Sequence, residues 1–301
     1  MLHSGQVEFV TVAPGLEIAP RSSWADAEPT GPLEAEAPGD VRFLLVHHTA
    51  STNDYEPADV VPQLRSFYAF HTGPEKGWPD IAYNFMVDRF GGVWEARAGS
   101  IDQPIKGSAT GGSQGFALLC CLIGNHDEEA PTSAAVDSLS RLLGWLADRY
   151  GIALGPGETA TFVSRGSNRW DAGVEVTTST ISGHREMSLT TCPGDHAFEL
   201  IGRTIIPAAA TAAGSAARAT STTEAATTTA APTTTAEPTT TAAPTTTTST
   251  TGPTVAATES ESAAAPIDTT GGRSLGPLGA AGVLGLGAVG GLIAWRRRTG
   301  R

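Results

Sequence analysis

Runs of hydrophobic residues along the first two thirds of the chain predict strands. Residues 42–48 contain an apolar run that ends in polar residues, and residues 116–123 are continuously apolar, which is typical of buried strands. Shorter segments with strand-forming residues, at residues 81–87 and 92–96, flank a turn rich in glycine, and residues 180–183 have the pattern of a last strand. The sequence therefore predicts five strands with central, fully buried members.

Between these strands, apolar residues recur at helical spacing in residues 59–70, 133–150 and 195–205. We expect Ser133 to cap the start of the second helix and Gly151 to end it, because a hydroxyl can accept a free N–H and glycine tolerates a left-handed backbone. Strands that alternate with helices predict an α/β fold, a single domain with a central, largely parallel mixed sheet flanked by helices.

Composition changes abruptly after residue 207. Residues 208–272 are almost entirely Ala, Thr, Pro and Ser, and contain few large apolar side chains. Such a segment cannot bury enough surface to offset its chain entropy, so we predict a disordered stalk, with threonines suited to O-glycosylation. The globular domain is expected to occupy residues 19–207.

Residues 275–295 are 21 residues without a charge, followed by a basic tail at 296–301 that begins with three arginines. About 20 apolar residues cross a bilayer as a helix, so we predict a transmembrane helix there. The positive-inside rule keeps the arginines in the cytoplasm and leaves the domain outside the cell membrane, on a single-pass anchor. A flexible Gly/Ala tail is the alternative interpretation.

Residues 1–18 form an N-terminal leader to which the sequence assigns no role. They have neither the basic start nor the continuous apolar run of an export signal. Two interpretations follow: the true start lies upstream of Met1, or the domain stays in the cytoplasm as a tail-anchored protein. We favour the first, because a long Thr/Pro stalk is suited to crossing a cell envelope.

The charge of the domain excludes one class of partner. Up to Pro207 the chain has 26 acidic and 13 basic residues, a net charge of −13 with histidine neutral. Binding to nucleic acid requires a basic surface, so nucleic acid is not an expected partner. Two of the three cysteines, Cys120 and Cys121, lie in the apolar run at 116–123, where burial in a strand explains them.

The third cysteine lies in a polar segment with a histidine, and this pair indicates a metal site. His184 and Cys192 are eight residues apart, and imidazole and thiolate are common zinc ligands. Pro193 favours an extended Cys192, and Gly194 allows a tight turn after it. A third ligand is best sought in residues 43–50, which contain His47 and His48 on opposite faces of a strand.

Several motifs together give the chain a resemblance to a known family. These are Arg-Ser-Ser-Trp-Ala at 21–25, Val-His-His-Thr-Ala at 46–50, Gly-Trp-Pro-Asp-Ile-Ala-Tyr-Asn-Phe at 77–85, Gly-His-Arg at 183–185 and Thr-Cys-Pro-Gly at 191–194. Residues 19–207 resemble the peptidoglycan recognition proteins and zinc-dependent N-acetylmuramoyl-L-alanine amidases. The motifs are specific as a set, although each alone is modest.

The resemblance implies that His47, His184 and Cys192 bind Zn²⁺, and that Tyr83 and Thr190 are the catalytic polar side chains. Three protein ligands leave one zinc position for water, whose pKa falls to about 7. Tyr83 would donate a hydrogen bond to that water or to the developing oxyanion. For Thr190, ordering of the loop is an equally weighted role.

The resemblance also implies that the substrate is peptidoglycan or muropeptides, bound by a protein that we expect to be monomeric. His48, Gly77, Trp78 and Arg97 are candidate substrate-binding residues. The Gly77-Trp78 pair resembles the family version that accepts diaminopimelate in the stem peptide, and we expect free backbone N–H groups there to bind its extra carboxylate. The chain departs from the family at residues 107–109, where many members have Gly-Ala-His.

The predicted activity is therefore hydrolysis of the amide bond between N-acetylmuramic acid and L-alanine. Two alternatives remain at the sequence level. Family members without the cysteine ligand bind cell wall and do not cut it, and the presence of Cys192 favours the enzyme. A cytosolic amidase that acts on soluble muropeptides would fit the missing export signal, but it leaves the stalk without a purpose.

Overall fold

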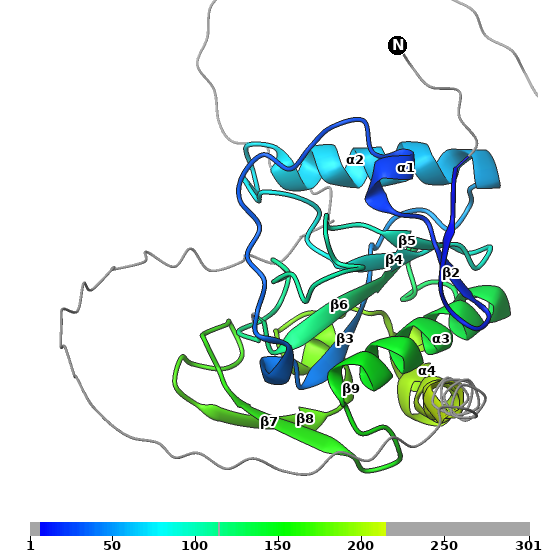
Figure 1. Cartoon of the computed structure of the whole chain (residues 1–301). Helices are drawn as coiled ribbons and strands as arrows, with labels where there is room; N and C mark the ends of the chain where they lie inside the picture. The colour runs from blue at the N-terminus through cyan, green and yellow to red at the C-terminus, as the bar shows by residue number, and fades with distance from the viewer. Residues whose placement is uncertain (1–6, 114, 215–301) are drawn as a thin grey trace, which may run out of the picture. The chain divides into compact units, whose positions relative to one another are not determined.

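A computed structural model of the chain describes residues 7–113 and 115–214 (Figure 1). The predicted membrane span, the basic tail and most of the predicted stalk lie outside the described residues. Within the described ranges, no helix combines the length and the hydrophobicity that a membrane crossing requires.

The central sheet has five strands in the order β5-β4-β6-β3-β9. β3 pairs in parallel with both β6 and β9, β4 pairs in parallel with β6, and the edge strand β5 is antiparallel to β4. The predicted α/β fold with a mixed, largely parallel sheet is confirmed. The strands are β3 (Phe43–His48), β4 (Phe85–Val87), β5 (Val93–Glu95), β6 (Ala117–Leu122) and β9 (Ile181–Gly183).

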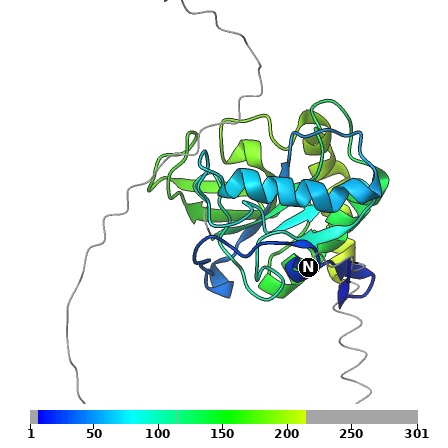
Figure 2. The ribbon, with the colours of Figure 1, turned by 90° about the horizontal axis from the view of Figure 1, so that it is seen from above.

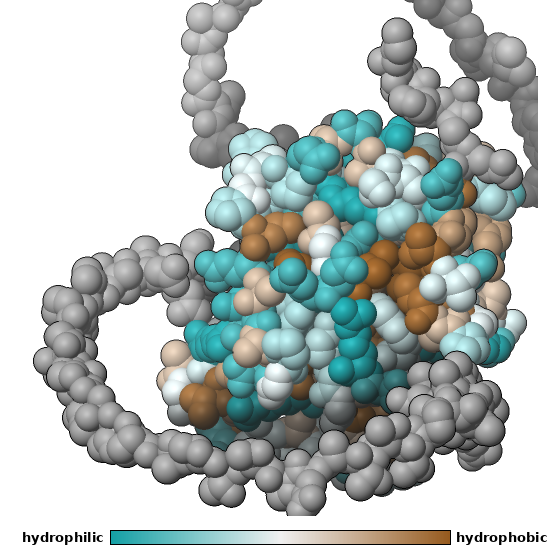
Figure 3. All heavy atoms as spheres, in the orientation of Figure 1, coloured by the Kyte–Doolittle hydropathy of each residue, from teal (hydrophilic) through white to brown (hydrophobic). Residues whose placement is uncertain are grey.

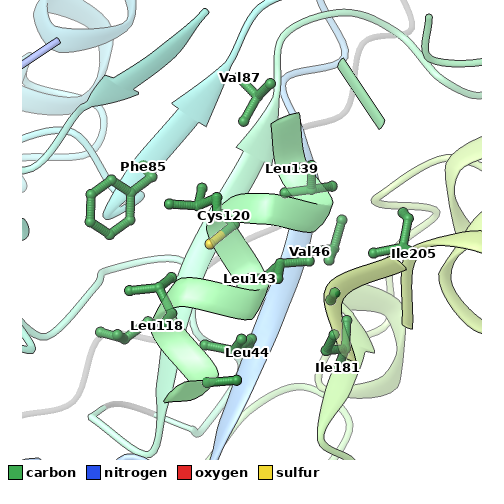
Figure 4. Packing of buried hydrophobic residues seen from close by; sticks show 14 of the residues in the cluster. Leu44, Val46, Phe85, Val87, Leu118, Cys120, Leu139, Leu143, Ile181 and Ile205 are labelled. Carbon is green, nitrogen blue, oxygen red and sulfur yellow. The ribbon is translucent and has the colours of Figure 1, made fainter. Parts of the chain in front are cut away.

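Helices cover both faces of this sheet (Figures 1 and 2). One face packs against α3 (Ser133–Tyr150) and α4 (Asp195–Leu200), and the other against α2 (Val60–Thr72). Figure 4 shows the first core, in which Leu139 and Leu143 of α3 lie against Leu44, Val46 and Cys120 of the strands. Because both faces are covered, the central strands are buried along their whole length, which explains their continuous apolar runs.

The start of α3 differs from the prediction by one residue. The N-cap is Thr132, whose hydroxyl accepts a hydrogen bond from the Ala135 N–H at 3.1 Å, so the assignment of Ser133 as the cap is wrong. The predicted stop is confirmed: Gly151 has the left-handed φ of 67° that ends the helix.

The predicted strand at 81–87 is wrong in its first half. Only Phe85–Val87 forms β4, because side chains accept hydrogen bonds from backbone N–H groups of the preceding residues. The Ala82 N–H donates to His71 Nδ1 at 3.3 Å and the Ile81 N–H donates to Asp80 Oδ1 at 2.8 Å. Asn84 Oδ1 accepts the Leu119 N–H at 2.8 Å, so a side chain replaces the backbone partner of β6. Tyr83 therefore lies in a bent segment before the strand.

The last helix is longer than expected. α4 continues through η4, a π-helical segment (Ile201–Ile205), and residues 206–214 are also helical. Ala209 is completely buried, and a Cβ added at Gly144 of α3 would lie 2.6 Å from the Ala209 carbonyl oxygen. Gly144 thus permits close approach of two helices, and the ordered chain extends into the beginning of the predicted stalk.

Two strand pairs were not predicted. β1 (Val10–Ala13) and β2 (Leu16–Ile18) form an antiparallel pair within the predicted leader, and Leu16 and Ile18 belong to the core. β7 (Thr159–Val163) and β8 (Glu175–Ser179) form a hairpin whose Phe162 stacks on Phe43 of β3, with ring centroids 5.2 Å apart. The hairpin therefore extends the core on the α2 face of the sheet.

The remaining elements are short. They are α1 (Arg21–Trp24) and the 3-10 turns η1 (Pro38–Asp40), η2 (Pro57–Asp59) and η3 (His184–Glu186). On the face seen in Figure 3, hydrophilic residues predominate and apolar residues gather in a few separate groups.

Candidate metal centre

Two histidines meet at the carboxyl edge of the sheet. β3 and β9 are parallel neighbours in which Val46 pairs with Gly183, so the following residues, His47 and His184, lie side by side. Their ring centroids are 4.3 Å apart. Both side chains therefore lie at the same edge of the sheet.

A tight turn brings Cys192 to the same place. The Arg185 N–H donates to the Cys192 carbonyl at 2.8 Å, which closes the loop between His184 and the cysteine. Gly194 has a φ of 88°, and a Cβ there would lie 2.3 Å from the His126 carbonyl carbon, so only glycine fits this corner. As a result, Cys192 Sγ lies 3.6 Å from His47 Nδ1.

These three residues fit a zinc ion. Their ligand atoms all lie within 4.8 Å of one another, and two imidazoles with one thiolate leave one of four zinc positions open. His47 Nε2 is buried and has no hydrogen-bond partner among the described residues. Apart from the contact between Cys192 Sγ and His47 Nδ1, the ligand atoms thus converge on one place with a buried nitrogen left unpaired.

Burial keeps all three groups uncharged when no cation is bound. It lowers the pKa of His184 to about 4 and that of His47 well below the usual 6.5, so both imidazoles are neutral ligands at pH 7. Burial also raises the pKa of the Cys192 thiol to about 12. A bound dication would reverse this shift, because a coordinating thiol is deprotonated. The thiolate form therefore depends on the metal.

Tyr83 lies directly against the centre. Its ring centroid is 5.0 Å from that of His47, and only 8% of the residue is exposed. Its hydroxyl interacts with the thiol of Cys121, which pairs with His47 in the sheet. Burial raises the pKa of Tyr83 well above 10, so the hydroxyl stays protonated and can donate a hydrogen bond.

Thr190 lies on the loop before Cys192 and is partly exposed. Its hydroxyl oxygen accepts the Cys192 N–H at 3.2 Å. This contact orders the loop, and it leaves the hydroxyl hydrogen available as a donor. Both roles considered for Thr190 are compatible with this position.

His48 faces away from His47, as strand alternation predicts. Its side chain is 5% exposed, and its Nδ1 accepts the His126 N–H at 3.1 Å. The backbone N–H of His48 donates to Cys192 Sγ at 3.4 Å. In this structure His48 contributes a backbone donor that supports a thiolate, while its imidazole lies in a second buried cluster.

Gly77 and Trp78 lie at the other end of a row of rings that begins at the metal centre. His71 links them, with its ring 5.7 Å from Tyr83 and 5.2 Å from Trp78 between centroids. Gly77 is exposed, with a φ of 60° and open space at its Cβ position. Trp78 is partly exposed.

The backbone donors expected at this pair are already used. The Gly77 N–H donates to the Gly73 carbonyl at 2.7 Å, and the Trp78 N–H donates to the His71 carbonyl at 2.9 Å. The expectation that they face a substrate carboxylate is therefore wrong. The positive charge available here is that of Lys76, whose Nζ lies 5.4 Å from the Trp78 ring centroid.

Arg97 is a buried side chain, 4% exposed. Its guanidinium donates to the Ile81 carbonyl at 2.8 Å and to Ser108 Oγ at 3.1 Å, and burial lowers its pKa to about 10. These contacts hold the segment that leads to Tyr83. The structure thus places Arg97 behind the candidate site, where it supports the backbone.

The sequence did not single out His126 or the interaction of Cys121 with Tyr83. His126 follows the carboxyl end of β6, at the edge where His47 and His184 meet, so a search for histidines that follow predicted strands would have found it. Cys121 gave no comparable signal, because an apolar strand is a sufficient explanation for a buried cysteine.

Known proteins resemble this chain over the part that carries the centre. A family model described as N-acetylmuramoyl-L-alanine amidase matches residues 37–195. Mouse peptidoglycan recognition protein 1 is 29% identical over 185 residues, which cover 61% of this chain and 85% of that protein. Human N-acetylmuramoyl-L-alanine amidase is 31% identical over 194 residues, which cover 61% of this chain and 27% of that protein.

Other matches are partial or distant. Drosophila melanogaster peptidoglycan-recognition protein LE is 34% identical over 127 residues, 42% of this chain and 35% of that protein. The chain thus spans about a third of the length of that relative. The solved structure of Drosophila peptidoglycan recognition protein SD has 22% identity and a TM-score of 0.49, and the match covers 62% of this chain and 93% of that one. Because the family model matches more than half of its 301 residues, the chain belongs to the N-acetylmuramoyl-L-alanine amidase family.

Proposed function

We propose that this protein hydrolyses the amide bond between N-acetylmuramic acid and the L-alanine of peptidoglycan stem peptides, with Zn²⁺ held by His47, His184 and Cys192. The observation that carries the proposal is the convergence of these three ligands beside Tyr83 in a member of the amidase family. When bound, zinc supplies a Lewis acid and lowers the pKa of a bound water to about 7.

The residues of the chain then have separate tasks. The two imidazoles are neutral and ready to bind, and the His48 N–H donates to the Cys192 sulfur, where it stabilises the thiolate. Tyr83 keeps its proton at neutral pH and donates a hydrogen bond toward the oxygen on which negative charge develops. Thr190 holds the Cys192 backbone and offers a second donor.

Recognition without cleavage is the second candidate function, because several relatives have recognition names and their printed names state no activity. The complete ligand set, including Cys192, favours the enzyme. A protein that only binds cell wall does not require a thiolate that is stable only beside a cation.

The stem peptide is proposed to lie along His71, Trp78 and Gly77. A preference for diaminopimelate over lysine would arise from Lys76, because the ammonium lies beside Trp78 and the extra carboxylate is the difference between the two stems. Comparison of kcat/KM on matched muropeptides checks this assignment. A preference of about tenfold is expected to disappear in Lys76→Met.

We also propose that the domain acts outside the cell membrane, on the anchor predicted at residues 275–295. The support for this location is the uncharged run followed by three arginines. Protease added to intact cells is then expected to remove the domain, and a domain that is protected until the membrane is broken would favour the cytoplasmic alternative.

Substitution of the cysteine ligand tests the proposed activity. Cys192→Ser is expected to lower the zinc content of the full chain from about one ion to a small fraction, and to abolish release of stem peptide. Cys120→Ala is the matched control, because Cys120 is buried in the core on the α3 face and contacts no ligand group. Equal activity in the two variants would refute the assignment of the centre.

A further inference from the structure

The corner that carries Cys192 packs against a second loop, residues 124–127 after β6, which we call the β6 loop. The His196 N–H donates to the His126 carbonyl at 3.1 Å, and the backbone of His126 leaves no room for a side chain at Gly194. The His126 N–H in turn donates to His48 Nδ1 at 3.1 Å. The β6 loop therefore contacts both the Cys192 corner and the end of β3.

One side chain of this loop, Asp127, bonds to the chain on both sides of Cys192. Thr191 Oγ1 donates to Asp127 Oδ2 at 3.0 Å, and the Asp195 N–H donates to Asp127 Oδ1 at 3.2 Å. Thr191 directly precedes the cysteine in the sequence, and Asp195 follows it by three residues. A single carboxylate thus holds the two ends of the turn from which the Cys192 sulfur reaches the metal centre.

The β6 loop is itself fixed by hydrogen bonds. The Asn125 N–H donates to Asn53 Oδ1 at 2.9 Å, and Asn53 Nδ2 donates to the Asn125 carbonyl at 2.9 Å. The Gly124 N–H donates to Thr49 Oγ1 at 2.9 Å, and the Asp127 N–H donates to Asn125 Oδ1 at 3.2 Å. Because the loop is ordered in this way, the Asp127 carboxylate has a defined position before any ion binds.

The charge of Asp127 has two opposed effects on the centre. Burial is the main cause of the high pKa of the Cys192 thiol, and the nearby Asp127 carboxylate raises that pKa further. The same negative charge would attract a cation. The two hydrogen bonds, in contrast, act in one direction, because both keep the Cys192 corner in place. A neutral side chain of the same shape can separate this geometric contribution from the charge.

We propose that Asp127 is a positioning residue of the metal centre, whose two hydrogen bonds hold the Cys192 sulfur where a zinc ion can bind it together with His47 and His184. This role rests on the proposed function, which assigns the three ligands. Without the Asp127 contacts the corner would have to be ordered when the ion binds, and this ordering costs binding free energy. Side chains that orient metal ligands typically change metal affinity by a factor of about 10–100.

Two substitutions of Asp127 test this role through the affinity of the full chain for Zn²⁺, measured by competition with a chromophoric chelator. Asp127→Ala removes both hydrogen bonds and is expected to weaken zinc binding by a factor of about ten or more. Asp127→Asn keeps the shape: its Oδ1 can accept the Asp195 N–H, and its amide can donate to the Thr191 hydroxyl oxygen. We expect this variant to bind zinc nearly as tightly as the original chain.

Asp59→Ala is the matched control, because Asp59 is also an exposed carboxylate and accepts the Glu56 N–H at 2.9 Å at the start of α2. It is expected to leave zinc affinity unchanged. Thr191→Val removes one of the two donors to Asp127 and keeps the side-chain shape, so we expect a smaller loss of affinity. Because the two residues share one contact, adding Thr191→Val to Asp127→Ala is expected to cause little further loss.

Co²⁺ provides a second measurement, because a thiolate bound to cobalt gives a charge-transfer absorption band that reports the bond to Cys192 directly. At saturating Co²⁺ this band is expected to weaken or shift in Asp127→Ala and to be retained in Asp127→Asn and Asp59→Ala. A residue that only stabilised the fold would lower the midpoint of urea unfolding and leave both the band and the zinc affinity unchanged.

Unchanged zinc affinity in Asp127→Ala or in Thr191→Val would overturn the proposed role of Asp127. Equal losses in Asp127→Asn and Asp127→Ala would also overturn it, because the charge and not the hydrogen bonds would then be responsible. If the original chain bound no zinc, both this role and the proposed function would be refuted. The expected pattern of zinc affinities without any hydrolysis of muropeptides would refute the proposed activity and leave the role of Asp127 in place.

Discussion

His71 connects the stability of the fold to pH. Its imidazole is 4% exposed, accepts the Ala82 N–H on Nδ1, and lies between the rings of Tyr83 and Trp78. Burial, with a smaller contribution from Lys76 and Arg97, lowers its pKa from 6.5 to about 4. Between these two values the unfolded chain binds a proton at this ring and the folded chain does not.

The free energy of unfolding must therefore fall as the pH falls from 6.5 to 4. Each unit of pKa difference is worth about 1.36 kcal/mol, so this one ring accounts for a loss of about 3 kcal/mol across that window. Above pH 6.5 both states are neutral and the contribution is constant. Below pH 4 both states are protonated and no further loss occurs.

His71→Asn is the informative change, because an amide oxygen can accept the Ala82 N–H in place of Nδ1 but does not titrate. We expect urea unfolding curves of the full chain, measured with a chelator present, to show a variant that loses about 3 kcal/mol less than the original between pH 6.5 and 4. His196→Asn, at an exposed histidine, is the matched control. Parallel stability curves for His71→Asn and the original chain would show that His71 does not cause the loss of stability at low pH.

Three further predictions concern the site, the core and the anchor. Tyr83→Phe is expected to lower kcat about 100-fold with unchanged zinc content, as measured by stem-peptide release and metal analysis, because it removes one donor to the developing oxyanion. Asn84→Ala is expected to lower the free energy of unfolding by about 3 kcal/mol in urea titrations, because the buried Leu119 N–H and Ile105 carbonyl lose their partner. Deletion of residues 275–301 is expected to move the protein from the membrane fraction to the soluble fraction. Unchanged kcat in Tyr83→Phe would contradict the first prediction, and an unchanged free energy of unfolding in Asn84→Ala would contradict the second. A truncated protein that stays in the membrane fraction would contradict the third.

The sequence predicted the sheet because its signals are local. The runs at 43–46 and 116–123 are apolar on both faces, and their short length favours strands that are covered on both sides. His47 directly follows the first run and His184 directly follows the strand at 181–183, and the carboxyl ends of parallel neighbours meet at one edge, so their approach could be inferred without coordinates. Pro193 and Gly194 indicated a tight turn after Cys192, which pointed to this cysteine as the remaining ligand.

What the sequence missed depends on contacts between distant residues. The bend before Tyr83 exists because the side chains of His71, Asp80 and Asn84 accept hydrogen bonds from backbone N–H groups in place of backbone carbonyls. The spacing of apolar residues along the sequence does not indicate which side chains make such bonds. The hairpin of β7 and β8 is rich in threonine and has no continuous apolar run, and its one large core residue, Phe162, was too weak a signal. The N–H groups of Gly77 and Trp78 looked free because a turn that uses them has no distinctive composition.

Removal and return of zinc show whether hydrolysis depends on the metal centre of His47, His184 and Cys192. The full chain is stripped with a chelator, dialysed, and assayed for release of L-alanine-linked stem peptide from N-acetylmuramic acid before and after addition of one equivalent of Zn²⁺. Stripped protein is expected to be inactive, and activity is expected to return in proportion to the zinc bound until one ion per chain is reached. Full hydrolysis by the stripped protein, or no hydrolysis by protein that holds one zinc ion, would contradict this dependence on zinc.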